Sequence, residues 1–203
     1  MNKPGIRPFL PPLLYEPPTR TITVGGDSAD IQGFNSDAIQ AAADLMPGSG
    51  VIRLEAGTFT ISAPIRLKSG TTLIGSGEHQ TILHKSDGFH SPLLLDADYA
   101  ELVATVKDPS GFRPGMGMFV IDDDNNSAWG VSTAVITAVE GNTLFFDRYL
   151  HRDYREDKNG MVGNACSLIE GIEVQGITVS NLVLDGNGGK NDPLDSCRGG
   201  GIY

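Results

Sequence analysis

Apolar and polar positions alternate along residues 51–85 in short segments of four or five residues, which read VIRL, TFTI, PIRL, TTLIG and TILHK. An alternation with a period of two residues predicts β-strands that bury one face. A meander of hairpins would need longer strands and turn dipeptides such as Asn-Gly between them. The spacing therefore favours short strands that are joined at corners.

The parity of the apolar positions changes from one segment to the next. Ile52 and Leu54 are even-numbered, whereas Phe59 and Ile61 in the next segment are odd-numbered. Such a change means that the chain turns a corner while its apolar side chains keep facing the same interior. Strands of this kind predict a parallel β-helix, in which each coil buries its inner face by stacking on its neighbours.

The same pattern returns near the end of the chain, in ITVSNLVLDGNG. Residues 177 and 179 share one parity, and Leu182 and Leu184 share the other. The corner falls on Ser180 and Asn181. Asn tolerates the left-handed backbone conformation that a sharp corner requires. We interpret the break as a structural corner of the solenoid.

One convincing helix precedes these strands, in FNSDAIQAAADLMPGSG. Asn35 or Ser36 can cap it, apolar residues follow at helical spacing, and Pro47-Gly48 ends it. A short strand is predicted before it in RTITVGGD. Residues 1–20 are interrupted by prolines and predict an extended arm.

Residues 91–168 follow a different pattern, with longer strands and a clear hairpin. TAVITAV and TLFFDRYL flank the turn EGN. We expect a small antiparallel β-barrel-like domain inserted into the β-helix, which occupies residues 21–90 and resumes over residues 169–203. The alternative is a single irregular β-sandwich.

Composition limits the classes of partner. The 203 residues are 39% hydrophobic and 20% charged, and the formal net charge is −10. This charge argues against nucleic acid as a partner, and together with the lack of a long apolar run it gives no reason to invoke a membrane. Cys166 and Cys197 are too few for a disulfide framework, and their pairing stays open.

The stretch GSGVIRLEAGTFTISAPIRLKSGTTLIGSGEHQTIL, with the helix SDAIQAAADLM before it, resembles the N-terminal coils of the pectate-lyase-like right-handed β-helix superfamily. VSNLVLDGNG is similar to a later coil of the same superfamily. The resemblance covers roughly residues 20–90 and 170–203. It implies an all-β fold, a right-handed parallel β-helix with a capping helix, and it implies polysaccharide as the ligand.

The superfamily includes lyases, hydrolases, epimerases and non-catalytic tailspike modules, so the resemblance does not fix a reaction. We expect the N-terminal part of a carbohydrate-active protein of lyase or glycoside hydrolase type, without a complete active site in this segment. The alternative is a non-catalytic tailspike-like or glycan-binding module. An open solenoid end exposes unpaired strand edges, which suggests self-association.

Candidate catalytic residues lie in the last coils. Asp185 follows a predicted strand, where it is either a turn-forming residue or an acid, base or hydroxyl acceptor. Asp195 and Arg198 lie in KNDPLDSCRG and are candidates for a hydrolytic pair or a lyase site, with a mobile loop as the alternative. The spacing of these residues fits neither reaction uniquely.

Two aromatic residues of the insertion are candidates for substrate binding. Trp129 is either a sugar-stacking platform or part of the core. Tyr154 belongs to the mixed segment RYLHRDYRED, which is either a contact for an acidic glycan or an exposed loop with local ion pairs. The acidic run IDDDNNSAW keeps calcium open as a cofactor, although a solvated turn is the favoured interpretation. The start of the chain lacks the pattern of a secretory signal, so we expect an extracellular or periplasmic location only if a signal was removed, and otherwise a cytoplasmic or virion-associated one.

Overall fold

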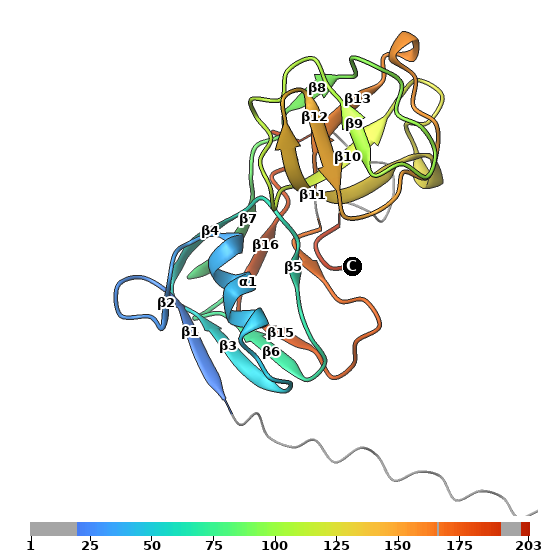
Figure 1. Ribbon diagram of the computed structural model, residues 1–203. Helices are drawn as coiled ribbons and strands as arrows, with labels where there is room; N and C mark the ends of the chain where they lie inside the picture. Colours follow the sequence, from blue (N-terminus) through green and yellow to red (C-terminus); the bar gives the residue numbers. More distant parts are fainter. Residues whose placement is uncertain (1–19, 166, 192–199) are drawn as a thin grey trace, which may run out of the picture.

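The computed structural model describes residues 20–165, 167–191 and 200–203. Figure 1 shows two bodies, a solenoid of parallel strands and a separate antiparallel sheet above it. The solenoid contains the helix α1 (Ser36–Asp44), and its strands are β1 (Thr21–Gly25), β2 (Ile31–Gln32), β3 (Gly50–Leu54), β4 (Gly57–Ile61), β5 (Ile65–Arg66), β6 (Thr71–Ile74), β7 (Thr81–Lys85), β14 (Ile169–Glu170), β15 (Thr178–Ser180) and β16 (Val183–Asp185).

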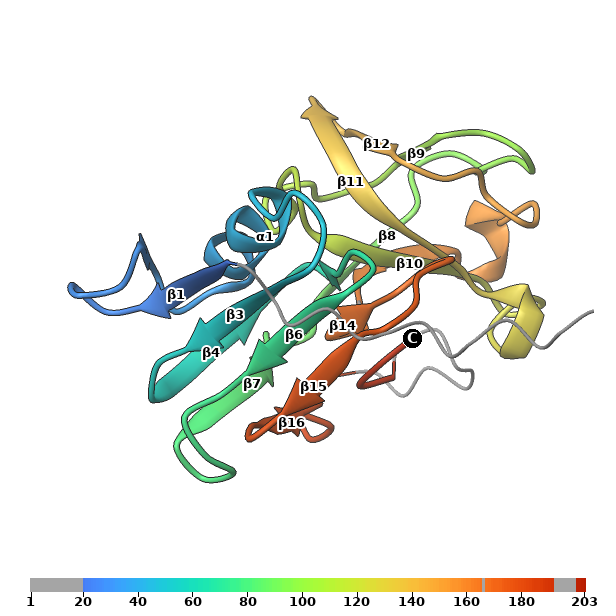
Figure 2. The ribbon, with the colours of Figure 1, turned by 90° about the horizontal axis from the view of Figure 1, so that it is seen from below.

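Three parallel sheets form the sides of the solenoid. The first has the order β15-β6-β3-β1-β2, the second β16-β7-β4, and the third β14-β5. Strands that lie next to each other in a sheet come from successive coils, as Figure 2 shows for β3, β6 and β15. This pairing confirms the predicted parallel β-helix and excludes the single irregular sandwich.

Corners between strands keep one set of side chains inside the coils. Ile52, Leu54, Phe59, Leu73 and Leu83 are all fully buried in one core, even though the parity changes between β3 and β4. Each side chain buries its apolar surface only because the adjacent coil covers it, at about 25 cal/mol per Å² of apolar area.

The predicted corner between β15 and β16 is present. Asn181 has φ of +55°, in the left-handed region, and its carbonyl accepts a hydrogen bond from the Gly77 amide at 3.0 Å. Leu182 and Leu184 on the far side of the corner pack against the same core as Val179 before it. The parity change is therefore a corner, as the sequence predicts.

Helix α1 lies beside β5, where a further strand of the third sheet would lie, and it covers the edge of β5. The Asn35 side chain caps the helix by accepting from the Ala38 amide at 2.9 Å. Gln40 then accepts from the Arg66 amide at 2.7 Å and donates to its carbonyl at 3.3 Å. One side chain thus replaces the backbone partner that an edge strand lacks.

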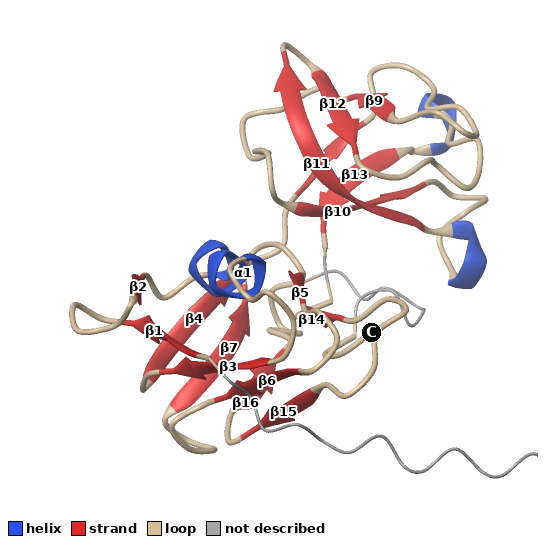
Figure 3. Cartoon of the chain, turned by 60° about the horizontal axis from the view of Figure 1, so that its bottom comes forward, coloured by secondary structure: helices blue, strands red, loops and turns tan. Residues whose placement is uncertain are grey.

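The antiparallel sheet enters the solenoid within its third coil, between β7 and β14. Its order is β8-β13-β10-β11-β12-β9. The strands are β8 (His90–Pro92), β9 (Val103–Thr105), β10 (Gly117–Ile121), β11 (Ser132–Glu140), β12 (Thr143–Phe146) and β13 (Met161–Asn164), with short 3₁₀ helices at Ala128–Gly130 and Glu156–Lys158. Figure 3 shows the strong curl of β10 and β11.

The two edge strands of this sheet, β8 and β9, are joined to each other at their C-terminal ends. Leu94 donates to the Thr105 carbonyl at 2.8 Å, and Lys107 donates to the Pro92 carbonyl at 2.8 Å. These bonds join the sheet into a barrel-like body with its own core. The expected inserted β module is confirmed, whereas the limits 91–168 stay a prediction.

Candidate functional site

The structure describes three of the five residues that the sequence singled out. Asp185 lies at the end of β16, Trp129 lies in the first 3₁₀ helix, and Tyr154 lies in the loop before the second. Asp195 and Arg198 lie outside the described residues, as does Cys166, so their roles stay predictions.

Asp185 is part of a polar cluster on the outer face of the second sheet. Its Oδ2 lies 2.8 Å from Nδ1 of His84, the residue aligned with it on the neighbouring strand β7. Oδ1 accepts from the Asn187 amide at 2.9 Å. Both side chains are partly exposed, at 33% for His84 and 47% for Asp185. The pair is therefore open to a ligand that lies along this face.

A second carboxylate is connected to this pair through Asn187. The Asn187 amide nitrogen Nδ2 donates to Oδ1 of Asp87 at 2.8 Å and to the Lys85 carbonyl at 3.1 Å. Asn187 has φ of +49°, which turns the chain so that one residue contacts both acids. We call His84, Asp87, Asp185 and Asn187 the coil-face cluster.

Hydrogen bonds keep Asp185 ionised. The backbone amide of Asn187, and after it the imidazole of His84, hold the pKa of Asp185 below its ordinary value. In the tautomer in which Nδ1–H of His84 donates a hydrogen bond to the ionised carboxylate, Nε2 is the acceptor of the ring. This arrangement suits proton abstraction at Nε2 of His84, and the ionised Asp185 has no proton to donate.

Tyr154 has no exposed surface. It is the largest fully buried side chain in the core of the inserted sheet. Its hydroxyl lies 2.6 Å from Oγ of Ser132 and donates to the Gly130 carbonyl at 2.6 Å. A glycan on the surface does not reach this ring. Trp129, by contrast, is 71% exposed.

The acidic run in the inserted sheet forms a turn. Asp122 is buried and accepts from the amides of Asp124, Asn125 and Arg155 at 2.7–3.1 Å. Over the described ranges, no group of three or more His, Cys, Asp and Glu side chains is arranged to hold a metal ion. The backbone amides of the turn and of Arg155 therefore satisfy the buried carboxylate of Asp122 without a calcium ion.

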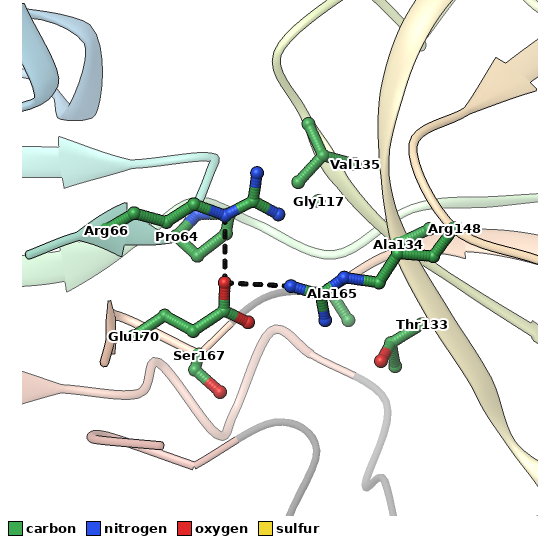
Figure 4. A pocket seen from close by; sticks show the side chains of 10 residues that line it. All are labelled: Pro64, Arg66, Gly117, Thr133, Ala134, Val135, Arg148, Ala165, Ser167 and Glu170. Carbon is green, nitrogen blue, oxygen red and sulfur yellow. Dashed lines mark hydrogen bonds and ion pairs between the residues drawn. The ribbon is translucent and has the colours of Figure 1, made fainter. Parts of the chain in front are cut away.

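A second polar site, which the sequence did not single out, lies where the inserted sheet meets the third side of the solenoid. Arg66 Nε and Arg148 Nη2 bind the same oxygen, Oε2 of Glu170, at 2.8 and 3.1 Å (Figure 4). Arg66 Nη2 also binds Asp147 at 2.8 Å. Burial opposes the charge of Arg66, but the bonds to the two acids outweigh it and raise its pKa.

Arg148 and Glu170 also border a groove of about 250 Å³. We call it the junction groove, and define it by the residues that line it, which are Thr133, Arg148, His151, Ser167, Glu170 and Tyr203. Arg148 and His151 belong to the segment RYLHRDYRED, but no short motif could have revealed the groove, since Thr133 of β11 and Glu170 of β14 lie far apart in the sequence.

No helix in the part of the chain that the structure describes has the length and hydropathy to cross a membrane. No curated protein matches the sequence.

Three solved tailspike proteins are similar in structure at low identity. The tailspike gp61 of Pseudomonas phage phi297 is 12% identical, with 73% of this chain and 30% of that chain covered and a TM-score of 0.35. The Gp54 tailspike of Acinetobacter baumannii bacteriophage AP22, solved with an A. baumannii capsular saccharide, is 14% identical over 83% and 34%, with a TM-score of 0.35.

The tailspike gp49 of Pseudomonas phage LKA1 is 16% identical, with 70% of this chain and 28% of that chain covered and a TM-score of 0.33. The chain thus spans about a third of the length of these tailspikes.

Residues 20–192 match the family described as "Rhamnogalacturonase A/epimerase, pectate lyase-like". The match includes both the solenoid coils and the inserted sheet. The chain therefore belongs to the pectate lyase-like rhamnogalacturonase A/epimerase family.

Proposed function

We propose that this chain forms the first coils of a β-helix protein that acts on a polysaccharide, and that the polysaccharide lies along the outer face of β4, β7 and β16. The observation that carries the proposal is the hydrogen bond between His84 and Asp185 on that face, within a cluster that holds a second carboxylate. Membership of a family named for polysaccharide chemistry supports it.

The coil-face cluster is suited to two kinds of reaction. With Nδ1–H of His84 donated to Asp185, Nε2 can take a proton from a sugar hydroxyl, from water or from the carbon beside a uronate carboxylate. Hydrolysis of a glycosidic bond needs two carboxyl groups on either side of the bond, and Asp87 is the second acid of the cluster. Asp195 and Arg198 stay candidates for completing the site.

The first measurement is binding. Affinity electrophoresis in gels that contain polygalacturonate or alginate would compare the wild-type chain with His84→Gln and Asp185→Asn. Thr178→Ala on β15 is the matched control, because Thr178 is an exposed threonine of the first sheet, outside the proposed binding face. We expect both cluster variants to weaken retardation and the control to leave it unchanged.

The second measurement is turnover of the same polysaccharides. Ultraviolet absorbance reports unsaturated products of elimination, and a reducing-end assay reports hydrolysis. We expect binding without robust turnover, because the cluster alone is an incomplete active site. Equal retardation of the wild type and both cluster variants would contradict the proposed function.

A further inference from the structure

The junction groove lies on the third side of the solenoid, whereas the coil-face cluster lies on the second. We propose that the junction groove is a separate binding site for a neutral sugar residue of a glycan chain. This inference rests on the proposed function in one respect, which is that the ligand of the protein is a polysaccharide.

The floor of the groove offers a hydrogen-bond donor beside an acceptor. Both arginines bind Oε2 of Glu170, and Oε1 accepts no hydrogen bond from any residue that the structure describes. Arg148 uses one Nη2–H for Glu170, and its other N–H groups have no acceptor in the described ranges. A guanidinium has five donors in a fixed plane.

This pairing suits hydroxyl groups, because each hydroxyl can donate and accept at once. One sugar hydroxyl can donate to Oε1 of Glu170 while its neighbour accepts from Arg148. The Glu170 side chain is only 9% exposed, so water competes weakly for its oxygen.

Charge decides between a neutral and an acidic sugar. Arg148 and Glu170 form an ion pair on the floor of the groove, and Arg66 behind them pairs with Asp147, so the floor has no excess positive charge. A uronate carboxylate would have to approach the ionised Glu170 and would gain no net attraction in return.

An aromatic side chain lines the groove. Tyr203 is 51% exposed, and its backbone is fixed to β14 by two hydrogen bonds, from its amide to the Ile169 carbonyl at 2.9 Å and from the Gly171 amide to its carbonyl at 2.8 Å. An exposed aromatic face packs well against the C–H face of a sugar. Because the backbone holds Tyr203, removal of the ring leaves the coil paired.

The size of the groove limits the ligand. At about 250 Å³ it is smaller than the pockets of 300–1,000 Å³ that enclose drug-sized ligands. It therefore accommodates a single sugar residue, with the rest of the glycan in solvent or along the solenoid.

The experiment uses the full chain on an array of neutral oligosaccharides (hexose, deoxyhexose and N-acetylhexosamine) beside oligogalacturonates and oligoalginates, with calorimetric titration of the best binder. The variants are Tyr203→Ala, Tyr203→Phe and Arg148→Met. Tyr99→Ala is the matched control, because Tyr99 is a 65% exposed tyrosine outside the groove. Thermal unfolding of each variant checks that it is folded.

We expect the wild type to bind neutral members of the array. Tyr203→Ala should weaken binding roughly 3- to 10-fold through the lost stacking, and Tyr203→Phe should retain it within about 2-fold. Arg148→Met should weaken it roughly tenfold or more, because a hydrogen bond to a charged group is lost.

Three results would overturn the inference: no neutral member binds, only the uronate oligomers bind, or Tyr203→Ala binds as the Tyr99→Ala control does. The His84→Gln and Asp185→Asn variants separate this inference from the proposed function. If both variants bind neutral sugars as the wild type does, the binding role of the junction groove is supported. If polysaccharide also retards both variants as strongly as the wild type, the proposed role of the coil-face cluster is contradicted.

Discussion

Nδ1 of His84 lies 2.8 Å from Oδ2 of Asp185, although the two residues are 101 positions apart in the sequence. The inserted sheet separates them along the chain, and the solenoid places them on adjacent strands in register. The pair therefore exists only if the coil closes correctly around the insertion.

The first prediction concerns the pKa of Asp185. In the wild type it is below the ordinary value of about 3.9, and in His84→Ala it should rise but stay below that value, because the Asn187 amide, the larger cause, is still present. A ¹³C titration of the carboxyl groups measures both.

The direction in which the stability of the fold changes with pH follows from the lowered pKa of Asp185. Because the folded state binds the proton of Asp185 more weakly than the unfolded state, the stabilisation is present above the ordinary pKa and is lost as the pH falls through the lower, folded value. His84→Ala should therefore reduce the change in stability across this acidic range. Identical titration curves for Asp185 in the two proteins would contradict the contact.

The second prediction concerns the corner at Asn181. Asn181→Val should destabilise the chain by about 1–2 kcal/mol, because a β-branched residue tolerates φ of +55° poorly. Asn181→Gly is the matched control and should be nearly neutral, since glycine adopts this conformation without steric cost. Urea unfolding measures both, and equal losses would argue against a left-handed corner.

The third prediction concerns the solenoid core. Phe59 is fully buried, and its ring centroid lies 5.0 Å from that of Phe34. Phe59→Ala should cost about 3–5 kcal/mol of unfolding free energy through lost burial and a cavity. Phe34→Ala, at a 39% exposed ring, should cost about 1 kcal/mol. Urea unfolding tests the order, and a reversed order would place Phe59 outside the core.

The fourth prediction concerns the attachment of the insertion to the solenoid. Glu170→Gln removes the charge that Arg66 and Arg148 share, and should destabilise the junction by roughly 1–3 kcal/mol, less than for a fully buried pair because both arginines are partly exposed. Hydrogen exchange at β5 and β14 would detect this loss.

A matched control for this prediction is Glu156→Gln, which removes an acid whose ion pair with Lys107 lies on the exposed surface of the insertion. It should change the stability by less than about 1 kcal/mol. Protection of β5 and β14 that stays the same in Glu170→Gln would show that the arginine pair does not fasten the insertion.

The alternating pattern of the chain was enough to predict the solenoid. The short strands from Val51 to Lys85, the helix capped by Asn35 and the corner at Asn181 all depend on local rules, which are the period of a strand, capping chemistry and left-handed geometry. The hairpin of β11 and β12 was predictable for the same reason, since a short turn joins it.

Contacts between distant segments decided the candidate sites. The sequence identified Asp185, but its partner His84 follows from the register of β7 with β16, which no local pattern encodes. The sequence also offered Tyr154 as a binding residue, and only the packing of the inserted sheet shows that its ring is buried.

The junction groove depends most on tertiary structure, because Thr133 comes from β11, Arg148 from the segment after β12 and Glu170 from β14. Sequence by itself determined where the chain makes strands and corners, since those are governed by neighbouring residues. The tertiary structure decided which polar side chains meet, since that depends on how coils stack and where the insertion attaches.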